Sequence, residues 1–284
     1  MRLAKISRGK DIGLAVSGDD GIRAIFGDPA LSDIDALVTA GGTALADAGA
    51  TVLARGETVS IDDLTFLPPL VKSSKIICLG LNYADHAAEG GFEPPSFPTL
   101  FGRFPSSLIG HNAPIIRPQV STQLDYEGEL VAVIGTRGKN ISREAALDHV
   151  AGYSVFNDGS IRDYQMKTPQ WTAGKNFDDT GAFGPWFVTP DELPAGAAGL
   201  KIETRLNGQV VQSASTSDMI FDVVDTIALL STFMTLEAGD VLVMGTPAGI
   251  GLARKPPLFM KAGDVVEVEI EKVGLLRNPI VDGD

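Results

Sequence analysis

The feature that most constrains the fold is a succession of short apolar runs from Lys75 onward, most of them closed by glycine, asparagine or aspartate. Such runs, rich in valine and isoleucine, are typical of strands. The predicted strands cover residues 75–80, 130–135, 152–157, 185–189, 200–207, 240–245 and 264–273. With 32 glycines in the chain, this pattern predicts a turn-rich mixed β or α+β core.

One helix is predicted in this part of the chain, over residues 221–235, with Asp218 or Ser217 as its N-cap and Gly239 just past its end. The segments 82–99 and 159–182 are expected to be long loops. Loops of that length in a compact domain usually carry function.

Residues 1–70 differ from the rest and are predicted to form a small N-terminal α/β domain, followed by a catalytic domain over 71–284. The stretches MRLAKIS, DIGLAVS and GIRAIF suggest three strands, and the alanine-rich segment 33–56 suggests one or two helices. All tyrosines, histidines and tryptophans of the chain lie after this region. We therefore expect the chemistry to lie in the second part.

The composition excludes several classes of protein. A net charge of −13 argues against a nucleic-acid partner, because phosphate binding needs a basic surface. No apolar run is long enough to span a membrane, and no secretory leader is recognised. The single cysteine, Cys78, allows no internal disulfide and is expected to be buried. A cytoplasmic protein without membrane contacts is predicted.

Three acidic residues in two short motifs indicate a metal site. Glu127 and Glu129 in LDYEGELVAVIG are two residues apart, so in a strand both side chains point to one face. Asp158 ends a second apolar run, in VFNDGSIRDYQ. The alternative for the two glutamates is an exposed, solvated strand face. Three clustered carboxylates would suit Mg²⁺ or Mn²⁺, with Asp125 as a supporting group rather than a ligand.

A histidine and a glutamate three residues apart suggest a general base. His86 and Glu89 lie in LNYADHAAEGG, where this spacing places both on one face of a helical turn. A carboxylate beside a histidine orients the ring and supports proton abstraction. The glycines that follow make this segment a candidate lid, whereas an ordinary surface turn is the alternative.

Further polar residues occur at positions where a substrate anion could bind. Lys175 lies in AGKNFDD, Arg103 lies between aromatic residues in LFGRFPSSLIG, and Thr246 lies in the glycine-rich turn GTPAGIG. Solvent-exposed charges are the usual alternative for such lysines and arginines. No nucleotide-binding loop and no serine-hydrolase motif is present.

Together these motifs resemble the fumarylacetoacetate hydrolase family. They occur in the family's order over about residues 75–252, as KIICLGLNYADHAAE, FGRFPSSLIG, LDYEGELVAVIG, GYSVFNDGSIRDYQ, GKNFDDTGAFGPW, LNGQVV, STSDMIFDVV and VMGTPAGIG. The resemblance implies a rolled β-sheet core, a small N-terminal domain, Mg²⁺ or Mn²⁺ as cofactor, and a homodimer or homotetramer.

The resemblance also implies roles for single residues. It places the metal on Glu127, Glu129 and Asp158, and it makes His86 and Glu89 a water-activating dyad on a lid. Lys175 becomes a catalytic and substrate contact near the metal, and Thr246 would bind the carboxylate of a pyruvate-like group. The remaining substrate-pocket residues would be Arg103, Tyr164 and Gln165.

The expected reaction is hydrolysis of the C3–C4 bond of a 2,4-diketo acid to pyruvate and a second acid. The resemblance favours 2,4-diketo-3-deoxy-L-rhamnonate, which would give pyruvate and L-lactate. The fuconate analogue, acylpyruvates or fumarylpyruvate, and oxaloacetate decarboxylation or isomerisation are the alternatives. A non-catalytic cation- or ligand-binding protein is the alternative from a different class.

Overall fold

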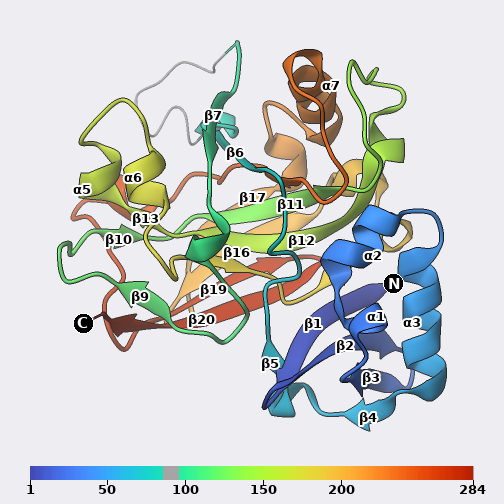
Figure 1. The fold of residues 1–284 in the computed structure, drawn as a ribbon. Coiled ribbons are helices and arrows are strands. Elements are labelled where there is room, and N and C mark those ends of the chain that lie inside the picture. The colour runs from blue at the N-terminus through green and yellow to red at the C-terminus, as the bar shows by residue number, and fades with distance from the viewer. Residues whose placement is uncertain (86–95, 284) are drawn as a thin grey trace.

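A computed structural model describes residues 1–85 and 96–283 as a rolled arrangement of strands with a few helices at its margins (Figure 1). The strands are β1 (Arg2–Arg8), β2 (Asp11–Gly18), β3 (Gly21–Phe26), β4 (Glu57–Val59), β5 (Thr65–Phe66), β6 (Ile76–Gly80), β7 (Thr99–Gly102), β8 (Leu108–Ile109), β9 (Ile115–Arg117), β10 (Leu124–Asp125), β11 (Gly128–Ile134), β12 (Val150–Asp158), β13 (Ser160–Ile161), β14 (Gly181–Phe183), β15 (Phe187–Val188), β16 (Lys201–Leu206), β17 (Gln209–Ser215), β18 (Val241–Val243), β19 (Val265–Ile270) and β20 (Gly274–Asp282). The α-helices are α1 (Pro29–Ser32), α2 (Ile34–Ala40), α3 (Ala44–Arg55), α5 (Arg162–Gln165), α6 (Thr172–Lys175) and α7 (Val223–Phe233).

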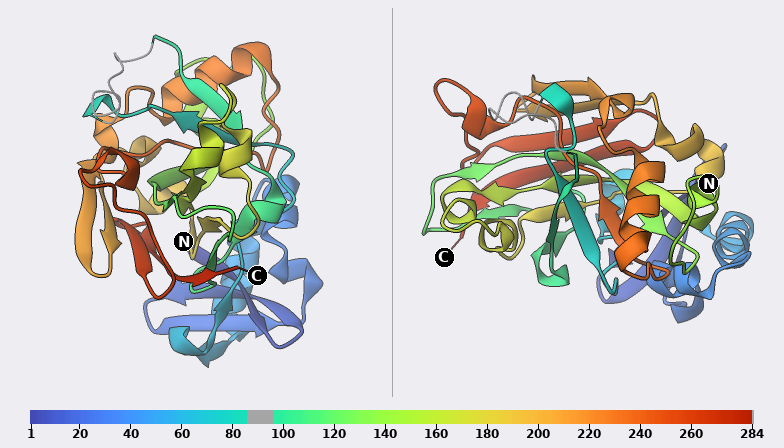
Figure 2. Two further views of the ribbon diagram at one scale, coloured as in Figure 1. Left: turned by 90° about the vertical axis from the view of Figure 1, so that its left-hand side faces the viewer. Right: turned by 90° about the horizontal axis from the view of Figure 1, so that it is seen from above.

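The largest sheet has the strand order β4-β3-β2-β1-β15-β12-β11-β18-β6-β7, and three further strands pair beside this path. Most of its pairs are antiparallel, whereas β18 pairs with β6 in parallel. A second sheet has the order β17-β16-β19-β20-β9. Its strands β16, β19 and β20 contact β11 and β12, and Figure 2 shows the two layers from two further sides. The predicted mixed β fold with a rolled sheet core is confirmed.

Strand β11 lies at the centre of the molecule and is buried on both faces. Leu130 and Ala132 belong to the core cluster that also contains residues of the second sheet. Val131 and Val133 point the other way, into a second cluster shared with Phe156 of β12. Alternation along the strand therefore places Glu129 on the same face as Val131 and Val133, at the end of a hydrophobic row.

The first strands form the antiparallel ribbon β1-β2-β3-β4, with α1, α2 and α3 beside it. The predicted strands of this region are confirmed, and the alanine-rich segment contains the two helices α2 and α3. Strand β1 also pairs with β15, with Leu3 opposite Phe187. The ribbon thus continues into the main sheet, and the predicted division at residue 70 stays a proposal.

Helix α7 confirms the predicted helix, but the predicted N-cap was wrong. Asp222 is the N-cap, and its side chain accepts a hydrogen bond from the backbone N–H of Asp225. Asp218 instead closes a capping box with Ser215 on the preceding 3₁₀ turn. A 3₁₀ turn with its own N-cap, Ser215, lies just before the helix. The spacing of residues along the sequence did not distinguish the cap of this turn from the cap of the helix.

Candidate metal centre and active site

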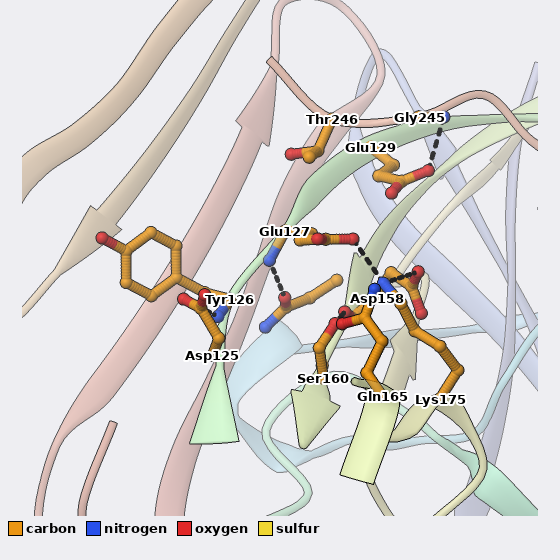
Figure 3. A network of polar contacts seen from close by, with 12 residues as sticks. Asp125, Tyr126, Glu127, Glu129, Asp158, Ser160, Gln165, Lys175, Gly245 and Thr246 are labelled. Atoms are coloured by element: carbon orange, nitrogen blue, oxygen red, sulfur yellow. Dashed lines mark hydrogen bonds and ion pairs between the residues drawn. The ribbon is translucent and has the colours of Figure 1, made fainter. Parts of the chain in front are cut away.

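The strand register brings the three predicted carboxylates together. In the pairing of β11 with β12, Gly128 lies opposite Asn157, and the backbone N–H of Asp158 donates to the carbonyl of Glu127 at 2.9 Å. Asp158 shares the face of Phe156, which is the face that Glu129 occupies on β11. The three side chains therefore converge at one end of the central strand pair, as Figure 3 shows.

Glu127, Glu129 and Asp158 each offer a carboxylate oxygen within 4.8 Å of the other two, and all three residues are buried. Burial raises the pKa of Glu129 well above its ordinary value, and the neighbouring charges of Asp158 and Glu127 raise it further. Its carboxylate accepts a hydrogen bond from the backbone N–H of Gly245 at 2.5 Å. The group is therefore costly to ionise unless a cation lies nearby.

Lys175 supplies one such positive charge. It lies at the end of α6, is 1% exposed, and its Nζ donates to Glu127 at 2.6 Å and to Asp158 at 2.7 Å. Burial alone would lower the pKa of Lys175, but the carboxylates of Asp158 and Glu127 outweigh it, so the pKa is raised. The ammonium group therefore stays protonated at neutral pH.

Arg162 is a functional residue that the sequence analysis missed. It begins α5, is 3% exposed, and binds three side chains, with Nε to Asp125 at 2.8 Å, Nη1 to Gln165 at 2.9 Å and Nη2 to Glu127 at 2.8 Å. Its position four residues after Asp158, in the same motif, was the available signal. The planar guanidinium holds Glu127 and Gln165 at fixed positions.

Asp125 connects Arg162 to the chain segment that follows β18. It is fully buried and accepts from the backbone N–H groups of Gly251 at 2.7 Å and Leu252 at 2.9 Å, as well as from Arg162. It therefore ties the segment after β18 to the carboxylate cluster. This matches the supporting role predicted for it, since it is not one of the three clustered ligand candidates.

Thr246 lies beside the carboxylates, with its hydroxyl group already engaged. The hydroxyl donates to the carbonyl of Gly128 at 3.0 Å and accepts from Gln212 at 2.8 Å. Gly245, with φ of 87°, makes the turn before it, and an added Cβ would lie 2.9 Å from the carbonyl oxygen of Leu79. The predicted role of Thr246 in binding a substrate carboxylate stays a proposal.

Arg103 lies behind the site rather than in its cavity. It is 2% exposed and forms an ion pair with Asp158, and it also donates to the Gly159 carbonyl at 3.1 Å and to Thr180 at 2.9 Å. Its guanidinium therefore orients the candidate ligand Asp158 from the far side. A direct substrate contact by Arg103 is a prediction that these contacts do not favour.

Of the two other residues predicted for the substrate pocket, only Gln165 lines the cavity. Gln165 is 6% exposed and lines the cavity, whereas Tyr164 packs edge-on against Phe177 with ring centroids 5.0 Å apart. His86 and Glu89 lie outside the described residues, as does most of the predicted lid over 82–99. The dyad and the lid therefore stay predictions.

A cavity of about 290 Å³ opens onto the carboxylates of Glu127 and Glu129. Its described lining comprises Leu79, Gly80, Leu81, Phe101, Glu127, Glu129, Arg162, Gln165, Met166, Trp171, Lys175, Thr246, Ile250 and Leu252. The cavity thus joins the ionic cluster to an apolar wall. It is large enough for a small organic acid.

The donor chemistry fits a divalent cation. Among the described residues, the ionised cluster contains one more negative than positive charge, since four carboxylates face three cations: Asp125, Glu127, Glu129 and Asp158 against Arg103, Arg162 and Lys175. An all-oxygen ligand set is the one that Mg²⁺ and Mn²⁺ prefer. A bound cation would offset the repulsion that raises the pKa of Glu129.

A rolled β core with a buried carboxylate triad at the end of its central strands defines a class of metal-dependent enzymes. Residues 75–281 match the family model described as "Fumarylacetoacetate (FAA) hydrolase C-terminal". The chain belongs to this family, whose members are enzymes that generally use a divalent metal.

The chain is also similar to individual proteins of known sequence or structure. The chain is 44% identical over 243 residues to a mitochondrial oxaloacetate tautomerase of Xenopus laevis, covering 85% of this chain and 76% of that protein. It is 43% identical over 256 residues to a mitochondrial oxaloacetate tautomerase of Rattus norvegicus, covering 89% and 82%. Among solved structures, a fumarylacetoacetate hydrolase from psychrophilic Exiguobacterium antarcticum matches with a TM-score of 0.87 and 36% identity over 100% of both chains.

In the described part of the chain, no helix is both long and apolar enough to cross a membrane. Both oxaloacetate tautomerases named above carry the word mitochondrial in their names. The predicted cytoplasmic location therefore stays a prediction, as do the predicted homo-oligomer and the absence of nucleic-acid and membrane partners.

Proposed function

We propose that this protein is a divalent-metal-dependent enzyme that interconverts the keto and enol forms of a 2-oxo acid, with oxaloacetate as its substrate. The observation that carries the proposal is the buried triad of Glu127, Glu129 and Asp158, of which Glu127 and Glu129 line a cavity that Lys175 also lines. The extensive similarity to two oxaloacetate tautomerases supports the choice of substrate.

The reaction moves one proton. The proton leaves C3, its electron pair forms the C2–C3 double bond, and the C2 oxygen takes up the negative charge and then a proton. When bound, Mg²⁺ or Mn²⁺ would supply Lewis-acid stabilisation of this charge. The chain's own contribution is the protonated Lys175, which can donate to a developing oxyanion, and Arg162, which holds Gln165 and Glu127 in place.

The charge of the site suits a dicarboxylate. With all seven ionised groups and one divalent cation, the cluster would carry a single positive charge. A buried cationic site favours an anion such as oxaloacetate. The base that removes the C3 proton is proposed to be His86, oriented by Glu89, a pair that the sequence predicts to activate water.

Hydrolysis of a 2,4-diketo acid is the second candidate. It is favoured by the full-length similarity to a solved fumarylacetoacetate hydrolase and by the predicted dyad, which could activate a water molecule. Within this reaction, 2,4-diketo-3-deoxy-L-rhamnonate is one candidate substrate, and L-lactate as the second product would identify it. The fuconate analogue, acylpyruvates and fumarylpyruvate are the others.

One assay separates these reactions. Purified protein is incubated with oxaloacetate enol, and with a panel of 2,4-diketo acids, in Mn²⁺, in Mg²⁺ and in EDTA. Enol absorbance and pyruvate release are followed together. For a tautomerase, we expect the enol absorbance to fall only when metal is present, without formation of pyruvate. Pyruvate from oxaloacetate would indicate a decarboxylase instead, and pyruvate with a second acid from a diketo acid would indicate a hydrolase.

A further inference from the structure

The cavity at the carboxylates has two chemically different walls. One consists of the ionic and polar residues described above, and the other is formed by Leu79, Leu81, Phe101, Met166, Trp171, Ile250 and Leu252. Stabilising charge at C2 of a 2-oxo acid uses only the first wall. The apolar wall is therefore available to a part of the ligand that the proposed reaction does not require.

Two aromatic rings form the centre of the apolar wall. Phe101 of β7 and Trp171, which precedes α6, contact edge to face with ring centroids 5.5 Å apart. The indole also lies directly against Gly80, where an added Cβ would be 2.2 Å from a ring carbon of Trp171. The absence of a side chain at Gly80 thus permits the position of the indole.

The aromatic wall begins beside the ionic cluster. Nζ of Lys175 lies 5.0 Å from the centroid of the Phe101 ring, and the same atom binds Glu127 and Asp158. A ligand with its 2-oxo acid group at the carboxylates would therefore have its next carbon atoms within reach of Phe101 and Trp171. The two walls belong to one continuous cavity.

Two solvent-exposed apolar side chains extend this wall. Met166 is 69% exposed and Leu252 is 38% exposed, and both line the cavity. Methionine is flexible and adapts to ligands of different shape. Exposed apolar surface beside a cavity is typical of a site that receives an apolar group.

We propose that Phe101, Trp171, Met166 and Leu252 form a subsite for an unbranched apolar chain on the C3 side of a 2-oxo acid. This inference rests on the proposed function, because the 2-oxo acid group must bind at the carboxylates. The protein then binds longer 2-oxo acids more tightly than pyruvate. Burying one methylene group is worth a factor of about four in affinity.

The test is calorimetric titration of the metal-loaded protein with pyruvate, 2-oxobutanoate, 2-oxopentanoate and 2-oxohexanoate. The expected result for the wild type is a gain of about fourfold per added methylene. Trp171→Ala removes the indole, and Gly80→Ala displaces it by contact. Both variants are expected to reduce the gain to less than about twofold per methylene. Phe233→Ala, which removes a half-exposed ring of α7 outside the cavity lining, is expected to retain the wild-type gain.

The outcomes separate the subsite from the proposed function. Metal-dependent binding of pyruvate with no gain along the series would overturn the subsite and leave the proposed function standing. Absence of metal-dependent pyruvate binding would overturn both. An undiminished gain in Trp171→Ala and Gly80→Ala would show that the chain binds elsewhere. If one variant fails to fold, the other still decides, because one removes the indole and the other displaces it.

Discussion

At the scale of single residues, the site combines groups that repel one another when no cation is bound. Glu129 is 1% exposed, lies on a hydrophobic strand face, and has a pKa raised by burial and by two neighbouring carboxylates. Lys175, Arg162 and Arg103 offset part of the negative charge. The remaining imbalance is the physical reason to expect that metal binding and stability are coupled.

Replacing Glu129 by glutamine tests this coupling. In EDTA we expect Glu129→Gln to raise the free energy of unfolding by about 1 kcal/mol, since a buried carboxylate that its neighbours repel becomes neutral. The amide oxygen can still accept from Gly245. With Mn²⁺ at about a hundred times its Kd, the wild type should gain about 2.7 kcal/mol, whereas the variant should gain almost nothing.

Urea unfolding with EDTA and with Mn²⁺ measures both effects. Glu271→Gln, a change at an exposed carboxylate outside the cluster, is the matched control and should behave as the wild type. A variant that is destabilised in EDTA and still gains full stability from Mn²⁺ would show that Glu129 is not a ligand.

At the scale of elements, the segment that follows β18 closes one side of the site. It begins at Gly245, which contacts Glu129, and it reaches Gly251 and Leu252, whose N–H groups donate to Asp125. Asp125 in turn binds Arg162 of α5. A shift of this segment would therefore reach Glu129 directly and Glu127 through Arg162.

Gly251→Ala should displace this segment. An added Cβ would lie 2.0 Å from the carbonyl oxygen of Leu258 and 2.5 Å from a carboxylate oxygen of Asp125. We expect a loss of about 1–3 kcal/mol in the free energy of unfolding, as for other overpacked positions, together with lower activity. Gly102→Ala is the control, because the nearest atom to its added Cβ is 3.7 Å away. Equal behaviour of the two variants in urea unfolding and in the enol assay would contradict this prediction.

At the scale of the whole molecule, the first strands and the central strands β11 and β12 share one sheet and one hydrophobic cluster. Strand β1 pairs with β15. Leu3 and Val16 from the first strands belong to the same cluster as Val131 and Phe156 of the central strands. This continuity couples the N-terminal region to the face that bears the carboxylates.

Scanning calorimetry tests how far this coupling extends. We expect one unfolding transition for the whole chain, because separating β1 from β15 would expose the shared cluster. Addition of Mn²⁺ should shift that single transition to higher temperature. Two resolved transitions, of which only the second responds to Mn²⁺, would instead support residues 1–70 as an independently folding domain.

Much of the site could be predicted from local sequence. The alternation in LDYEGELVAVIG predicted one strand face for Glu127 and Glu129, of which Glu129 lies in β11 and Glu127 lies one residue before it; the apolar run before Asp158 placed that residue at a strand end. Both inferences rest on the two-residue period of a strand, which short sequences show directly. The strands β1, β2 and β3 and helix α7 followed from equally local patterns.

Other features depended on contacts between distant segments. The register of β11 against β12 decided that Asp158 lies beside Glu127. Burial decided that Arg103 supports Asp158 and that Arg162, which local sequence did not single out, holds Glu127. The sequence by itself therefore determined the strands that carry Glu129 and Asp158 and singled out three carboxylates as ligand candidates, because strand periodicity is local. Only the tertiary structure decided which cations surround them and which apolar wall faces them, because those neighbours come from separate strands and loops.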